Sequence, residues 1–200
     1  MSNSIERFGL YVARNFLDAQ ECAQLVAEVR AAWGGPATVY REGASSLIDA
    51  TLRRTTRHML SKETTERVRQ LLLARMKEVG EHFGLVLHDC EDPQFLRYQE
   101  GDFFVAHQDG NTEQLQFDHL RVRRVSVVVF LNRQSETPAA DAFSGGALVF
   151  YDPYVDTARK ELGAPLSGEA GMFVAFRSET THEVVPVTHG ERFSIVCWYK

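Results

Sequence analysis

The sequence predicts an α+β fold that is mainly β, in which a jelly-roll barrel follows a helical region. Residues 1–84 contain two helical periodicities, whereas from residue 85 onward short β-rich runs alternate with turn residues. About eight such runs have to cover their edges, which favours a closed or sandwiched antiparallel structure. We expect a single domain over residues 1–200, with 1–84 as a helical support region and 85–200 as the β-barrel core.

Composition excludes several classes of function. The 200 residues are 44% hydrophobic and 24% charged, which is ordinary for one globular domain, and the net charge of -5 offers no general attraction to nucleic acid. No basic-then-apolar start and no apolar run near the ~20 residues of a membrane span occur, so we expect a cytoplasmic protein without nucleic-acid or membrane partners. Three cysteines, odd in number and without a C-x-x-C motif, indicate reduced structural thiols. Nothing in the sequence indicates the oligomeric state.

The first 36 residues predict an entry strand and a helix. Residues 8–16 have the composition of a strand, and Asp18 then begins D-A-Q-E, a variant of the capping box. Helical spacing predicts one buried stripe, made of Cys22, Leu25, Val26, Val29 and Trp33. The Gly-Gly-Pro at 34–36 is expected to stop this helix.

The next segment, residues 37–61, looks irregular and polar. Its basic cluster of Arg53, Arg54, Arg57 and His58 favours a solvated face. A second amphipathic helix is predicted from about Lys62 to Phe83, with Gly84 as its stop.

The β region follows as eight runs. They are 85–90, 94–100, 102–107, 124–132, 145–151, 171–176, 182–187 and 192–200. The longest break, 152–170, is too long for a simple turn, and we interpret it as a lid over a site. The alternative is a disordered surface loop without function.

Candidate metal ligands lie at the end of the run from Tyr98 to Gly110. His107 and Asp109 are two residues apart, and on a strand such residues share a face and can bind one ion. His182 offers a third ligand. Two histidines and one carboxylate form the facial triad that leaves positions on Fe(II) open, although the same set also suits a catalytic zinc ion.

Arg192 favours the iron interpretation. It lies ten residues after His182, at the start of the last strand, with Ser194 on the same face. A buried guanidinium needs a planar anion, and that carboxylate does not have to belong to the protein. The alternative is a plain salt bridge at the end of a strand.

The combined motifs resemble the 2-oxoglutarate- and Fe(II)-dependent dioxygenases of the prolyl 4-hydroxylase type. The resemblance covers about residues 95–200 and rests on Tyr98-x2-Gly101-x5-His107-x-Asp109, Gly145-Gly146, Gly171-x4-Phe176, His182-x3-Pro186-Val187-x2-Gly190-x-Arg192 and Trp198. It implies a double-stranded β-helix and Fe(II) bound by the triad. It also implies 2-oxoglutarate as co-substrate, with its far carboxylate held by Arg192, Tyr98 and Ser194, and O2 and ascorbate as further cofactors.

The chain also departs from that family. The resembling enzymes usually have Lys at the position of Arg192, and their peptide-contacting Tyr is here Phe104. The strand that begins near Arg123 resembles the family's R-x-x-T-x-x-x-Y-L stretch, so Phe104, Arg123 and Trp198 are candidate substrate contacts. The implied substrate is a small molecule, such as an amino acid or another metabolite, or an amino-acid residue of a protein.

The sequence therefore favours a hydroxylase that releases succinate and CO2. Two alternatives stay open: a metal-binding β-barrel that acts as a sensor or interaction module, and a jelly-roll metalloenzyme that does not use a keto acid.

Overall fold

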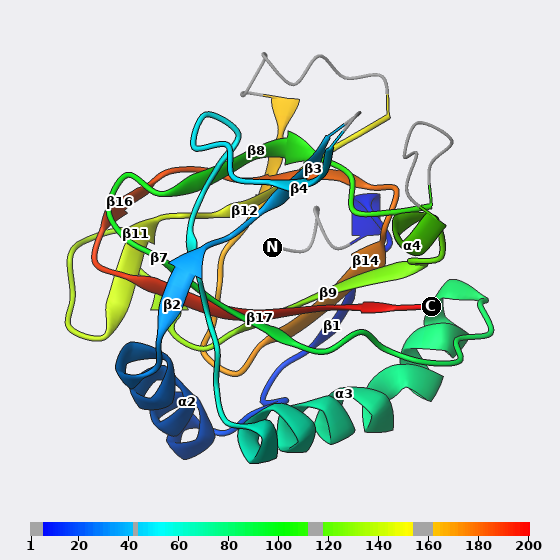
Figure 1. The fold of residues 1–200 in the computed structure, drawn as a ribbon, viewed down its shortest axis with the longest axis horizontal. Coiled ribbons are helices and arrows are strands. Elements are labelled where there is room, and N and C mark those ends of the chain that lie inside the picture. Colours follow the sequence, from blue (N-terminus) through cyan, green and yellow to red (C-terminus); the bar gives the residue numbers. More distant parts are fainter. Residues whose placement is uncertain (1–5, 42–43, 112–117, 154–161) are drawn as a thin grey trace.

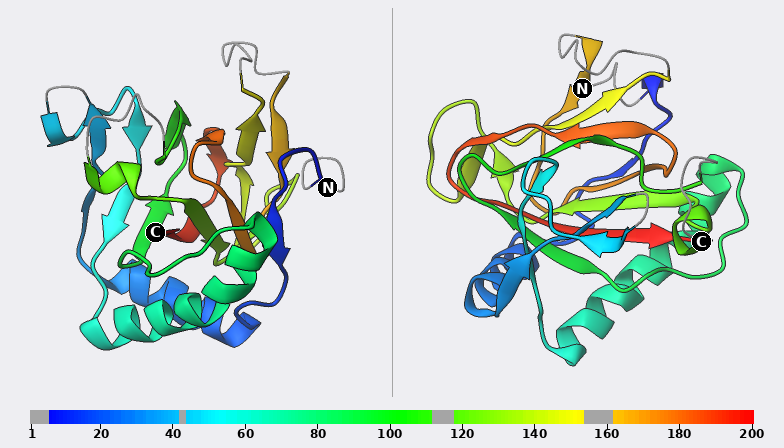
Figure 2. Two further views of the ribbon diagram at one scale, coloured as in Figure 1. Left: turned by 90° about the vertical axis from the view of Figure 1, so that its right-hand side faces the viewer. Right: turned by 45° about the horizontal axis from the view of Figure 1, so that its top comes forward.

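A computed structural model of the chain describes residues 6–41, 44–111, 118–153 and 162–200 (Figure 1). Two antiparallel sheets face each other, and helices α2 (Ala19–Ala31) and α3 (Lys62–Phe83) lie against one of them. Figure 2 shows both helices on the same side of the sheets. A short helix, α4 (Asp118–Arg121), follows the strand that carries the first predicted ligand.

The strands form two large sheets and two small ones. The seven-stranded sheet has the order β1 (Tyr11–Ala13), β14 (Phe173–Arg177), β9 (Val125–Phe130), β17 (Arg192–Tyr199), β7 (Gln94–Tyr98), β6 (Thr56–His58) and β2 (Gly34–Pro36). The five-stranded sheet has the order β13 (Ala164–Leu166), β12 (Leu148–Tyr151), β15 (Thr181–Val184), β8 (Phe103–His107) and β5 (Arg53–Arg54). The small sheets are β10 (Arg133–Gln134), β11 (Ala142–Gly145) and β16 (Val187–His189), and β3 (Val39–Arg41) with β4 (Ala44–Leu47).

Strand β9 shows how the sequence builds two cores. All six of its side chains are buried, because the seven-stranded sheet is covered on both faces. Val127 and Val129 pack with the helices, whereas Val128 and Phe130 pack between the sheets. Each such side chain stabilises the fold by about 1.5–3 kcal/mol.

Strand β17 alternates in the same way. Phe193, Ile195, Cys197 and Tyr199 belong to the core on the helix side. The intervening residues, from Arg192 to Trp198, therefore face the space between the two sheets. This alternation sets the position of the site described below.

Helix α2 confirms the predicted capping box. The Asp18 carboxylate accepts a hydrogen bond from the Glu21 amide at 2.8 Å, and the Glu21 carboxylate accepts one from the Asp18 amide at 2.9 Å. The prediction that Trp33 belongs to the buried stripe is wrong, because the helix ends at Ala31 and Trp33 is 75% exposed. Residues 34–36 form strand β2 instead of a simple stop.

Helix α3 has the predicted bounds. It ends at Gly84, whose positive φ of 64° is the left-handed conformation that favours glycine at a helix end.

Seven of the eight predicted β runs contain a strand. The prediction fails for 85–90, where Cys90 alone makes an isolated bridge to Tyr199. It also missed β2, β5 and β6, which come from residues 34–58 and extend both large sheets. The region predicted as helical support therefore contributes strands as well as helices.

The break at 152–170 is only partly described. Its residues 154–161 lie outside the described residues, and β13 within it pairs with β12. The lid stays a prediction, as does the single-domain organisation. All three cysteines are free and buried. Within the described ranges, no helix combines the length and apolar character needed to cross a bilayer.

Candidate active site

The two predicted histidine ligands meet across a strand pair. His107 ends β8 and is the register partner of His182 in β15. Partners in an antiparallel pair project to the same face, and the centroids of these two rings lie 4.3 Å apart. With Asp109 they form a group whose ligand atoms all lie within 4.8 Å of one another.

Asp109 reaches the site by a different route from the one predicted. Strand β8 ends at His107, so Asp109 is not on the strand. Its amide instead donates a hydrogen bond to the Ser178 carbonyl at 2.9 Å. Gly110 allows the close approach that follows, because a Cβ there would lie 2.5 Å from the Cβ of Arg123.

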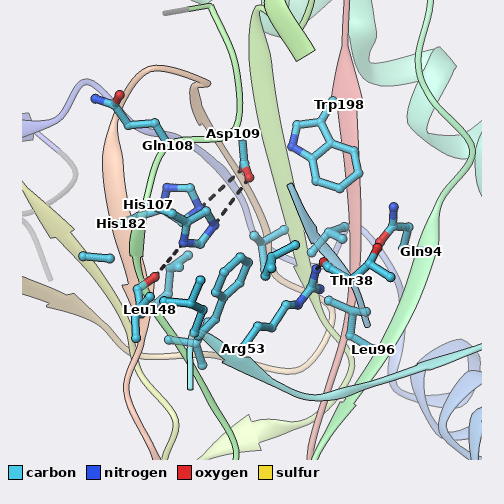
Figure 3. A pocket seen from close by; sticks show the side chains of 18 of the residues that line it. Thr38, Arg53, Gln94, Leu96, His107, Gln108, Asp109, Leu148, His182 and Trp198 are labelled. Carbon is cyan, nitrogen blue, oxygen red and sulfur yellow. Dashed lines mark hydrogen bonds and ion pairs between the residues drawn. The ribbon is translucent and has the colours of Figure 1, made fainter. Parts of the chain in front are cut away.

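Backbone carbonyls orient both imidazoles. His107 Nδ1 lies 2.8 Å from the Val105 oxygen, and His182 Nδ1 lies 2.9 Å from the Thr180 oxygen. We assign the proton of each ring to Nδ1, which leaves the Nε2 lone pairs free. Each Nε2 lies 3.5 Å from one carboxylate oxygen of Asp109 (Figure 3). The three ligand atoms therefore converge on one point.

The charge states also suit a metal. Burial, and then the neighbouring His107, lower the pKa of His182 to about 4, so this imidazole is neutral at neutral pH. Burial alone would raise the pKa of Asp109, but His182, His107 and Arg123 outweigh it and hold that pKa well below its usual range. A neutral imidazole at His182, the imidazole of His107 and the carboxylate of Asp109 fit a divalent ion with open positions.

Arg192 is a buried cation without an acidic partner in the described part of the chain. It is 1% exposed and stands opposite Tyr98 in the register of β17 and β7. Its guanidinium carbon lies 5.1 Å from the Tyr98 ring centroid and 4.9 Å from that of Phe130. Nη1 donates a hydrogen bond to Ser194 Oγ at 2.9 Å, whereas Nε has no partner among the described residues.

This environment fits an external carboxylate. Burial lowers the pKa of Arg192, and Tyr98 offsets part of that effect, yet no carboxylate of the described chain pairs with it. The plain salt bridge considered from the sequence is therefore not found among the described residues. A buried guanidinium without a counter-charge is costly, so an anion from outside the protein would complete this site.

A cavity of about 290 Å³ connects Arg192 with the three ligands. Tyr98 is 2% exposed and lines it, and so do apolar side chains that include Leu148 and Val184. The roles of Tyr98 and Ser194 toward a co-substrate stay predictions, although both lie next to Arg192 as those roles require.

The three candidate substrate residues also line this cavity. Phe104 stacks on His107 with ring centroids 3.6 Å apart. Arg123 donates to both carboxylate oxygens of Glu91, at 2.8 and 2.6 Å, and lies 3.7 Å above the Trp198 ring. The guanidinium of Arg123 thus has a partner that the sequence does not indicate.

Sequence reasoning missed two further cavity residues, Arg53 and Arg57. The predicted solvated face is correct for Arg54, which is exposed and pairs with Asp102 at 3.1 Å. It is wrong for Arg53 and Arg57, which are half-buried in the cavity wall, and for His58, which is buried. Alternation along β5 explains the difference between Arg53 and Arg54, because adjacent residues of a strand point to opposite faces. Arg57 and His58 belong to the next strand, β6.

Comparisons with known proteins agree with this geometry. The sequence profile of the 2OG-Fe(II) oxygenase superfamily matches residues 93–200. A PKHD-type hydroxylase of Paracoccus denitrificans is 36% identical over 107 residues, which are 53% of this chain and 41% of that protein. The matched region therefore spans about two fifths of the length of this curated relative.

Solved structures share the fold. A prolyl-4-hydroxylase of Pseudomonas putida has a TM-score of 0.66 at 24% identity, covering 99% of this chain and 95% of its own. A prolyl hydroxylase of Trichoplax adhaerens, solved with a fragment of hypoxia inducible factor, has a TM-score of 0.69 at 18% identity, covering 98% and 86%. These likenesses confirm the predicted double-stranded β-helix.

Proposed function

We propose, on the premise that this chain belongs to the 2OG-Fe(II) oxygenase superfamily, that it is an Fe(II)- and 2-oxoglutarate-dependent hydroxylase. The observation that carries the proposal is the buried Arg192, which has no acidic partner among the described residues and lies in the same cavity as the three ligands. A metal site alone would fit a sensor or a zinc enzyme equally well. A metal site joined to a cation without a counter-charge favours a co-substrate that carries two separated carboxylates.

The three ligands have distinct tasks in this proposal. His107 and His182 offer Nε2 lone pairs, and their Nδ1 hydrogen bonds to backbone carbonyls hold the rings in the orientation that a metal needs. Asp109 supplies the negative charge and is anchored by the Ser178 carbonyl. When bound, iron would support the coupled reaction in which a substrate C–H, O2 and 2-oxoglutarate give C–OH, succinate and CO2.

Arg192 would bind the far carboxylate of 2-oxoglutarate. Ser194 holds Nη1, so the guanidinium is already oriented before the anion arrives. The aromatic rings of Tyr98 and Phe130 exclude water around it, which strengthens a charge-assisted pair. Tyr98 and Ser194 would complete the binding site as hydroxyl donors.

The substrate would be a small molecule or an amino-acid residue of a protein. Phe104, Arg123 and Trp198 line the same cavity and are the proposed contacts. Ascorbate as a reductant and a cytoplasmic location complete the proposal.

Equilibrium binding tests this function directly. Purified protein is loaded with Fe(II) without oxygen and titrated with 2-oxoglutarate, and succinate is measured after oxygen is admitted. We expect 2-oxoglutarate to bind only with metal present, and succinate to form above the metal-free background. Metal binding without 2-oxoglutarate binding would instead support the keto-acid-independent enzyme or the non-catalytic barrel.

A further inference from the structure

Arg53 occupies a defined position next to the metal ligands. Its register partner across β5 and β8 is Phe104, and its guanidinium carbon lies 4.6 Å from the Phe104 ring centroid. Phe104 in turn stacks on His107. The guanidinium of Arg53 therefore contacts the same phenyl ring that stacks on His107, which places a cation one ring away from a metal ligand. Figure 3 labels Arg53 and His107 among the side chains of this cavity.

The hydrogen bonds of Arg53 are incomplete. Nη1 donates to the Thr38 carbonyl at 3.0 Å, while Nε has no partner in the described part of the chain. None of the described acidic side chains forms an ion pair with Arg53. Burial lowers the pKa of Arg53, whereas the charges of Tyr98 and Asp109 and a side-chain hydrogen bond with Tyr98 favour its charged form, and Arg57 adds repulsion. The guanidinium nevertheless stays protonated.

The charges around the cavity do not balance. Among the described residues, the cavity is lined by four arginines, Arg53, Arg57, Arg123 and Arg192, and by one carboxylate, that of Asp109. Glu91 pairs with Arg123, 2-oxoglutarate would pair with Arg192, and Asp109 would bind the metal. Arg53 and Arg57 keep uncompensated positive charge after this assignment. Buried charges are normally paired, so this excess indicates a second anion.

The neighbouring Arg54, on the same strand, has the acidic partner that Arg53 lacks among the described residues. Arg54 points to the other face of β5, donates to Asp102 at 3.1 Å and is 51% exposed. Arg54 thus has a carboxylate partner near the solvent, whereas Arg53 lines the cavity without an acidic partner among the described residues.

We propose that the primary substrate is a small free carboxylic acid whose carboxylate binds to the guanidinium of Arg53, with Arg57 as a nearby second cation. A guanidinium that stacks on an aromatic ring keeps its edge available, and that edge matches the two oxygens of a carboxylate. The cavity of about 290 Å³ is at the small end of ligand pockets, which favours a small molecule over a peptide. This inference rests on the proposed function and specifies its substrate class.

Matched pairs of ligands test the inference without any mutation. Ni(II)-loaded protein saturated with 2-oxoglutarate is titrated by calorimetry with the free L-amino acids and other small carboxylic acids, each compared with its primary amide. We expect at least one acid to bind, with its amide roughly 10- to 100-fold weaker, as the loss of a charge-assisted pair predicts. Equal binding of acid and amide would overturn the inference, as would a complete lack of acid binding.

Three variants then locate the contact. Arg53→Gln should weaken the acid roughly 10- to 100-fold, to the level of its amide, without changing the dissociation constant of 2-oxoglutarate. Arg53→Lys should recover part of the affinity because it keeps the charge. Arg54→Gln is the matched control on the same strand and should change neither affinity.

Two results would contradict the assignment of Arg53. If Arg53→Gln weakens 2-oxoglutarate and not the acid, Arg53 belongs to the co-substrate site. If peptides with acidic side chains bind while free acids do not, the substrate class is wrong. Failure of the wild-type protein to bind 2-oxoglutarate is a separate result that rejects the proposed function, and the acid and amide pairs can still be compared on the Ni(II)-loaded protein.

Discussion

The two faces of the seven-stranded sheet differ in the hydrogen bonding of their buried polar groups. On the helix side, the Tyr199 hydroxyl is buried but donates a hydrogen bond to the Leu72 carbonyl at 2.7 Å. On the cavity side, the Nε of Arg192 and the Nε1 of Trp198 are buried without partners in the described chain, as is the Nε of Arg53 on the facing strand β5. Outside the cavity, His58 Nε2 and the Nη2 of Arg67 on helix α3 also lack partners there. Most buried polar groups of a protein are satisfied internally, so the three that lack partners around one cavity are available to a ligand.

Arg123 supports this distinction from within the cavity. It is buried like Arg192, but the chain supplies the carboxylate of Glu91 to pair with it. Arg192 has no such partner among the described residues. The difference separates a cation that holds the wall together from one that is available to a co-substrate.

The largest expected effect concerns the metal ligands. His182→Ala removes one of three ligands, so metal content and turnover should fall to background. The melting temperature of the metal-free protein should change by only a few degrees, because the substitution relieves a buried polar group in the cavity face. Metal analysis and circular dichroism measure both quantities. Full metal content and a full rate of turnover in this variant would show that His182 is not a metal ligand.

Arg192 should affect co-substrate binding and not metal content. Arg192→Ala removes the cation and leaves the far carboxylate of 2-oxoglutarate without a partner, so its KM should rise by about 100-fold. Arg192→Lys should be milder because it keeps the charge, although it gives up the bidentate geometry. Steady-state kinetics at fixed Fe(II) provide the measurement. An unchanged KM in both variants would make the guanidinium purely structural.

The sequence was sufficient for residues whose partners are close in the chain or fixed by strand period. The two-residue spacing identified His107 and Asp109, although Asp109 lies past the end of β8 and is held by the Ser178 carbonyl and not by the strand. Arg192 and Ser194 follow from the alternation of β17. Arg53 was missed because a two-residue strand has no detectable period, and nothing local indicates that it faces Phe104. The Glu91 partner of Arg123 lies 32 residues away, so only the folded chain brings the two together.

Substitution on the helix side should give the opposite pattern from the cavity. Leu72 is fully buried between helix α3 and the sheet, and Leu72→Ala should lower the free energy of unfolding by about 3 kcal/mol through lost burial and a cavity. The KM for 2-oxoglutarate should not change in the protein that remains folded. Urea unfolding and kinetics below the transition measure the two effects. A large change in KM would show that the two faces are not independent.

The smallest expected effect is the pH dependence of stability in the metal-free protein. The pKa of His182 is about 4 in the folded state and 6.5 in the absence of its surroundings, so between these values the unfolded state binds more protons. The free energy of unfolding therefore falls as the pH decreases through this window, by on the order of 2 kcal/mol between pH 7.5 and pH 5. The depressed pKa of Asp109 acts in the same direction at lower pH.

Urea unfolding at several pH values measures how the free energy of unfolding changes with pH. His182→Asn is the control, because it removes the titration of His182 and keeps a polar side chain. If the free energy of unfolding changes equally with pH in both proteins, burial in the cavity does not disfavour the protonated imidazole of His182. The two faces of the sheet would then not differ in their electrostatics.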